Sequence, residues 1–164
     1  MTRPTIGNQI KSDNCRFSTR RRTKIENYKP SCMQARATEE ELEILTIRTY
    51  VRKEKSERYA EFVSKPRSRP KFIANLAHFK DLDFGKFRKL DGNEADHIRE
   101  MARSAKFDVC YVISENRRID ARFLEFEKAI NDTIGYGMGT LLVFGLAEVV
   151  YYEGEEMGDR WISI

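Results

Sequence analysis

The sequence predicts an α+β fold, in which an amino-terminal half of two to three helices packs on a small mixed sheet of about four strands. Three observations predict it. Apolar residues recur at helical spacing in residues 38–106, a continuous apolar run follows at residues 109–113, and short apolar segments alternate with glycine-containing turns in residues 140–164. We therefore expect one α+β domain over residues 38–164, mainly helical to residue 106, with the sheet and one helix in residues 107–164.

A basic arm is expected before this domain. Residues 1–37 contain nine Lys or Arg, two acidic residues and no helical or strand period, which is typical of a flexible segment. Guanidinium groups bind phosphate oxygens through paired hydrogen bonds, so the arm is a candidate nucleic-acid contact, with a solubilising tail as the alternative. The candidate contact residues in the arm are Arg16, Arg20, Arg21, Arg22 and Lys24.

The domain is expected to begin with a long helix. Thr38 with Glu41 three residues later has the spacing of a capping box, and an apolar stripe continues to Val63 before Pro66. Ser68 and Pro70 suit the start of a second, antiparallel helix that continues to Phe79.

The turn between these two helices alternates basic residues with helix breakers. Unpaired amides and the macrodipole at a helix amino terminus attract anions, and here cations lie beside them. The turn is therefore the preferred polyanion contact of the ordered region, with a solvated hairpin tip as the alternative. Its candidate residues are Lys65, Arg67, Arg69 and Lys71.

A third helix is expected after the cap residue Asn93, and the apolar run 109–113 suits a strand that is buried on both faces. Phe123, Phe126 and Ile130 share one face of a fourth helix that begins near Asp120 and ends at Gly135. The order strand, helix, strand predicts a right-handed parallel βαβ crossover. An antiparallel meander should follow, formed by residues 140–144, 147–152 and 160–164.

Cysteine and apolar patterns indicate compartment and cofactor content. Cys15, Cys32 and Cys110 show neither paired spacing nor a Cys-x-x-Cys motif, so we expect no disulfide framework, no metal site and no cofactor. No apolar run approaches the ~18 residues of a membrane span. A cytoplasmic protein without a membrane partner is the expectation.

Glu148 is the best single candidate for a catalytic residue. Strand alternation places it on an inward face with Val150 and Tyr152, where burial would raise the pKa of its carboxyl group toward values suited to proton transfer. The alternative is a carboxylate that points to solvent. The candidate companions of Glu148 are Tyr111, Asp120 and Asp132.

Charge is unevenly distributed along the chain. Residues 1–90 hold 22 Lys or Arg against 11 Asp or Glu, and residues 91–164 hold 8 against 15. This asymmetry favours a cytosolic, non-catalytic protein that binds nucleic acid, preferably RNA or a ribonucleoprotein, through the arm and the basic turn. Five to eight neutralised phosphates would give a logarithmic salt slope of about −4 to −7 on a duplex.

Two other function classes remain open. In one, the acidic carboxy-terminal domain is an interaction or regulatory module that binds an oppositely charged protein or a second copy of the chain, as a homodimer that weakens with salt. In the other, the protein is a small hydrolase or transferase that uses Glu148.

Overall fold

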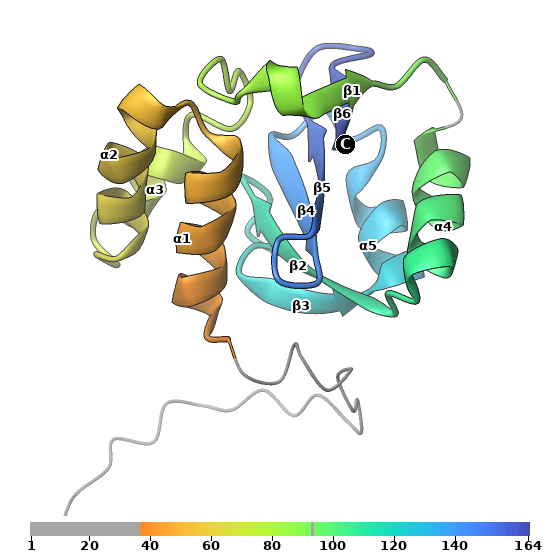
Figure 1. Ribbon diagram of the computed structural model, residues 1–164, viewed down its shortest axis with the longest axis horizontal. Helices are drawn as coiled ribbons and strands as arrows, with labels where there is room; N and C mark the ends of the chain where they lie inside the picture. The colour runs from red at the N-terminus through yellow and green to blue at the C-terminus, as the bar shows by residue number, and fades with distance from the viewer. Residues whose placement is uncertain (1–36, 93) are drawn as a thin grey trace, which may run out of the picture.

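The computed structural model describes residues 37–92 and 94–164, and in these residues the chain forms a six-stranded sheet with helices against both faces (Figure 1). The strands are β1 Phe87–Lys89, β2 Val109–Ser114, β3 Arg122–Glu125, β4 Thr140–Phe144, β5 Val149–Glu153 and β6 Arg160–Ser163. The α-helices are α1 Glu39–Tyr50, α2 Lys53–Val63, α3 Arg69–Ile73, α4 Glu94–Ala105 and α5 Phe126–Thr133. This combination confirms the α+β class.

The strands are arranged in the order β1-β6-β5-β4-β2-β3, and every neighbouring pair in the described part of the chain is antiparallel. The predicted meander is confirmed, because β4, β5 and β6 pair in sequence. The predicted parallel crossover is wrong, since β2 and β4 are neighbours but run in opposite directions. The expected number of about four strands is also too low, because β1 and β3 join the two ends of the sheet.

The crossover was mispredicted because residues 120–125 do not start a helix. The chain turns at Ala121, whose φ is 53°, and then pairs as β3 with β2. Helical spacing had placed Phe123 and Phe126 on one face, but they pack against opposite faces of the sheet. The helix α5 therefore connects β3, not β2, to β4.

The helical half begins as predicted and then departs from the prediction. Thr38 Oγ1 accepts a hydrogen bond from the Glu41 amide at 3.2 Å, and the Glu41 carboxylate accepts one from the Thr38 amide at 2.8 Å, which confirms the capping box. The expected long helix is broken at Val51, which is extended and forms a bridge with Leu82. The second expected helix is short, because α3 ends at Ile73.

The sheet separates two apolar layers. On the face covered by α1 to α3, which we name the α1 face, side chains such as Tyr111 and Tyr152 are buried against those helices. On the other, the α5 face, Cys110 and Tyr151 are buried against α4 and α5. Neighbouring residues of β2 and β5 thus alternate between the layers, as expected for strands covered on both sides. None of the helices within the described ranges is long and apolar enough to cross a membrane.

Candidate nucleic-acid interface

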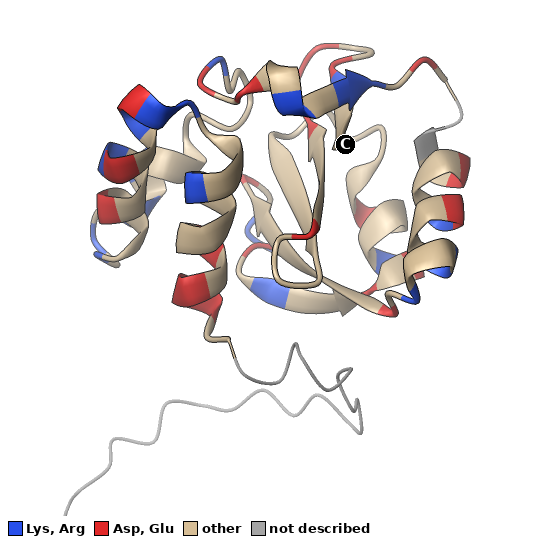
Figure 2. Ribbon diagram, viewed as in Figure 1, with Lys and Arg blue, Asp and Glu red and all other residues tan. Residues whose placement is uncertain are grey.

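The predicted nucleic-acid contacts fall into two groups. The arm residues Arg16, Arg20, Arg21, Arg22 and Lys24 lie outside the described residues. The basic turn is described and connects α2 to α3, where Lys and Arg are visible as blue segments (Figure 2).

Three of the four cations in the turn lie on the surface. Lys65 is exposed and pairs with Glu61 at 2.5 Å, an ion pair of two exposed side chains. Lys71 is also exposed, with its ammonium group 5.8 Å from the centre of the Phe62 ring. Arg67 is exposed and makes no ion pair with any residue that the structure describes. Arg67 can therefore bind an anion without losing an ion pair to any of the described residues.

Arg69 has a different environment, because its side chain is only 20% exposed. Its guanidinium donates three hydrogen bonds to Glu43, at 2.7, 2.9 and 3.0 Å, and two to Asp120, at 2.6 and 2.8 Å. Both carboxylates thus occupy the planar fork through which arginine would bind a phosphate. We conclude that Arg69 is held inside the domain, although the sequence placed it among the surface contacts.

Glu43, Arg69, Tyr111 and Asp120 together form what we name the Arg69 cluster. Glu43 is 2% exposed and accepts a further hydrogen bond from the Tyr111 hydroxyl at 2.7 Å. Asp120 accepts one from the Ser114 amide at 3.0 Å. Every buried charge in the cluster is therefore paired and hydrogen-bonded, which is the condition under which such charges are tolerated.

The cluster alters the proton affinity of two members. Burial alone would lower the pKa of Arg69, but hydrogen bonds to Asp120 and Glu43 and their negative charges raise it above the usual value. Burial, together with the charge of Glu43 and the hydrogen bond to it, raises the pKa of the Tyr111 hydroxyl well above 10. Arg69 is therefore a permanent cation and Tyr111 a neutral donor at physiological pH.

The cluster also joins two basic links. Asp120 belongs to the connection between β2 and β3, which carries Arg117 and Arg118, and β3 then begins at Arg122. The Cα atoms of residues two apart in sequence lie no more than about 7 Å from one another. The bridge from Arg69 to Asp120 therefore joins the link that carries Arg67 to the link that carries Arg118, at one corner of the domain.

A hollow lies beside the second link, and we name it the β3 hollow. It has a volume of about 300 Å³ and is formed by the β2–β3 connection, β3, α5 and the turn that follows α5. Three of its lining side chains are cationic and one is acidic, and the acid, Asp132, pairs with Lys128 at 2.6 Å. The lining residues are Asn116, Arg118, Ile119, Arg122, Leu124, Lys128, Asp132 and Tyr136.

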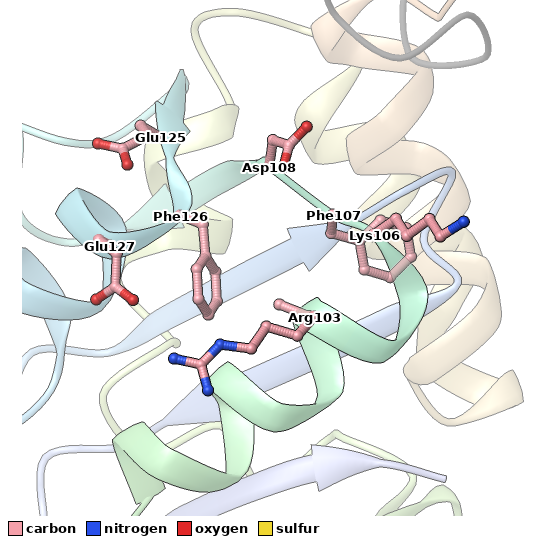
Figure 3. Close-up of a pocket in the computed structure, with 8 residues that line it drawn as sticks. Arg103, Lys106, Phe107, Asp108, Glu125, Phe126 and Glu127 are labelled. Carbon is pink, nitrogen blue, oxygen red and sulfur yellow. The ribbon is translucent and has the colours of Figure 1, made fainter.

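A larger hollow of about 460 Å³ lies between α4 and the start of α5 (Figure 3). Its lining includes three carboxylates, Asp108, Glu125 and Glu127, against the cations Arg103 and Lys106. Figure 3 shows that Arg103 extends toward the side of Glu127, whereas Lys106 points away. Glu127 also pairs with Arg99 at 3.0 Å, and the lining lacks the excess of cations that the β3 hollow has, so this hollow is the poorer anion site.

Glu148 does not have the position that a catalytic role required. It lies in the turn between β4 and β5, and its side chain is exposed, so the predicted inward face is wrong. Alternation fails there because β5 begins only at Val149. Two of its expected companions, Tyr111 and Asp120, do converge, but in the Arg69 cluster.

Other catalytic or metal-binding chemistry finds little support in the described residues. Burial raises the pKa of the Cys110 thiol, which is fully enclosed and so is a poor nucleophile. Within residues 37–92 and 94–164, no group of three or more His, Cys, Asp or Glu side chains is placed to hold a metal ion.

Sequence reasoning missed two parts of this site, and each has a signal. Glu43 lies four residues before Ile47 and seven before Tyr50, so a carboxylate at that position on the buried face of α1 needs a cation or hydrogen-bond donors as partners. Tyr136 lies between two glycines after α5, and Arg117 and Arg118 occupy a short link that sequence analysis treated only as a polar connection.

No protein-family model, no curated protein and no solved structure matches this chain. Its function is therefore inferred from its own side chains.

Proposed function

We propose that this protein is a non-catalytic binding protein that contacts nucleic acid, with RNA or a ribonucleoprotein as the favoured partner. One observation supports this most directly. Arg67 on one link and Arg117, Arg118 and Arg122 on the other are exposed, make no ion pair among the described residues, and belong to links that the Arg69 cluster joins. Guanidinium groups bind phosphate oxygens through paired hydrogen bonds, so exposed arginines on two joined links suit contacts to a nucleic-acid backbone.

RNA is favoured over duplex DNA because the same corner presents an aromatic ring. Tyr136 lines the β3 hollow together with Arg118 and Arg122 and is 62% exposed. Unstacked bases in RNA loops and ends are available for stacking on aromatic side chains, whereas the bases of a duplex are not. The basic arm adds further cations to the same predominantly electrostatic contact.

The proposal is tested by the salt dependence of RNA binding to the full chain. A labelled single-stranded RNA is titrated with wild type, with R20A/R21A/R22A and with R67A/R117A/R118A. Each lost phosphate contact reduces the magnitude of the logarithmic salt slope by about 0.7 on a single strand, so each triple variant should reduce it by about 2.

The matched control is K53A/K80A/R88A, which removes three exposed cations elsewhere in the domain. It should leave the slope close to that of wild type. Equal effects of the control and of R67A/R117A/R118A would reject the corner as the contact. Absence of binding at about 50 mM salt would reject nucleic acid as the partner, and a homodimer that dissociates with salt would then favour the protein-interaction alternative.

A further inference from the structure

The β3 hollow combines features that a phosphate contact alone does not need. It contains a mainly cationic wall, formed by Arg118, Arg122 and Lys128, and an exposed ring, Tyr136. Its volume of about 300 Å³ is at the lower end of the range for small-ligand sites, which suits one nucleotide better than a longer segment.

The backbone holds Tyr136 in an outward position. Its flanking residues Gly135 and Gly137 have φ values of 86° and 60°, conformations that favour glycine, so the turn can present the ring without strain at its neighbours. The Gly135 amide donates to the buried carboxylate of Glu153 at 2.9 Å, and the Tyr136 amide donates to the Thr133 carbonyl at 3.3 Å. The turn that carries this ring is thus anchored to the core.

The segment that carries the two arginines of the hollow is also held in place. The Asn116 side-chain oxygen accepts a hydrogen bond from the Arg118 amide at 3.1 Å, and the Asn116 amide donates to Ser114 Oγ at 3.0 Å. Arg122 is the first residue of β3 and is paired with Val112 of β2. Both arginine side chains are exposed, and neither has an ion-pair partner in the part of the chain that the structure describes.

From this arrangement we propose that the β3 hollow binds one unpaired nucleotide of a single strand, with its base stacked on Tyr136 and its phosphate held by Arg118 and Arg122. The inference rests on the proposed function and specifies the form of nucleic acid that the corner accepts. An aromatic platform beside cations is the usual means of binding single strands, because every base has a face that can stack. A duplex offers phosphates to the arginines but no free base to the ring.

The test compares an oligouridylate, an oligodeoxyuridylate of the same length and a duplex RNA, each fluorescein-labelled, in titrations with the full chain. Tyr136→Ala should weaken binding of the single strands roughly five- to 150-fold, the range expected for the loss of one stacked base. Its salt slope should stay unchanged, because no charge is removed, and duplex binding should not change. R118A/R122A should instead reduce the magnitude of the slope by about 1.4.

Two variants serve as controls. Tyr136→Phe keeps the ring and should retain single-strand binding, and Met157→Ala removes a fully exposed apolar side chain outside the hollow and should have no effect. Equal affinity for the two uridylates would support a site that recognises base and phosphate but not the sugar. Tighter binding of the ribose form would support a site specific for RNA.

The failures are distinguishable. If wild type binds single strands and Tyr136→Ala does not weaken that binding, the stacking site is wrong while the proposed function stands. Equal weakening of duplex binding would also overturn it. If wild type binds none of the three oligonucleotides at low salt, both the site and the proposed function are rejected.

Discussion

Each face of the sheet buries one carboxylate, and the two are stabilised differently. Glu43 on the α1 face and Glu153 at the end of β5, beside the α5 face, are both 2% exposed. Glu43 is paired with the whole guanidinium of Arg69. Glu153 instead accepts its short hydrogen bonds from the neutral donors Gly135 N, at 2.9 Å, and Tyr151 OH, at 2.7 Å, and forms a longer ion pair with Arg160 at 3.7 Å.

This difference shows two uses of a buried charge. The Arg69 cluster joins α1, α3, β2 and the β2–β3 connection, so it fixes segments that are far apart in the sequence and positions both basic links. Glu153 anchors the turn after α5, which carries Tyr136. The Arg69 cluster therefore joins distant segments, and the hydrogen bonds of Glu153 support one local turn.

The largest effect is expected from Arg69→Ala. It leaves the carboxylates of Glu43 and Asp120 without their cation, and breaking a buried pair in this way costs about 3–5 kcal/mol. This loss is a large part of the free energy of unfolding of a typical domain, which is about 5–15 kcal/mol. Urea unfolding, followed by circular dichroism, measures it.

Arg48→Ala is the matched control, because Arg48 pairs with Glu57 at 3.1 Å but the two side chains are 57% and 74% exposed. It should cost no more than about 1 kcal/mol. Arg69→Lys keeps the charge without the five-donor fork and should fall between the two. A cost for Arg69→Ala no greater than that of Arg48→Ala would show that the cluster does not join the segments.

A smaller effect should distinguish Tyr151→Phe from Tyr111→Phe, which remove matched hydroxyls 2.7 Å from the two carboxylates. After Tyr111→Phe, Glu43 keeps its three hydrogen bonds from Arg69, so we expect a loss of about 1 kcal/mol. After Tyr151→Phe, Glu153 loses one of its two short donors, and the expected loss is about 1.5–3 kcal/mol. The urea unfolding midpoints compare the two variants, provided that the free energy of unfolding depends equally steeply on urea in both. Equal losses would mean that the two carboxylates are equally well supported.

The parts of the fold that depend on local pattern could be predicted from the sequence. The capping box at Thr38, the buried strand β2 and the meander from β4 to β6 follow from residue spacing and turn chemistry within a few positions. For the same reason the basic character of the turn between α2 and α3 was visible in the sequence.

The remaining features depend on contacts between distant residues. Arg69 and Glu43 are 26 positions apart, and Arg69 and Asp120 are 51 apart, so no local pattern shows that this arginine points inward while Arg67 points outward. The segment of β3 fits helical spacing as well as it fits a strand, and only pairing with β2 decides between them. Pairing also explains β1, whose three residues are too few to show alternation.

The last effect we consider is alkaline destabilisation of the α1 face, which depends on neutral tyrosine hydroxyls. Tyr152 accepts from the Phe79 amide at 3.2 Å and donates to the Leu76 carbonyl at 2.9 Å. Burial, reinforced by the charges of nearby carboxylates and opposed by the hydrogen bond from the Phe79 amide, raises the pKa of Tyr152 from 10.0 to about 12. A raised folded-state pKa gives stability that is complete below pH 10 and is lost as the pH rises toward 12.

Tyr152→Phe tests this loss of stability between pH 10 and pH 12. At pH 8 the variant should be less stable than wild type, since a buried hydrogen-bonded hydroxyl is removed. Between pH 10 and 12, the free energy of unfolding of wild type falls by up to about 1.4 kcal/mol per pH unit through this group, and that of the variant does not. The difference in free energy of unfolding between the two proteins should therefore narrow. If the difference in free energy of unfolding between wild type and Tyr152→Phe stayed constant from pH 8 to pH 12, Tyr152 would titrate alike in the folded and unfolded chains. The α1 face would then not depend on the neutral form of this hydroxyl.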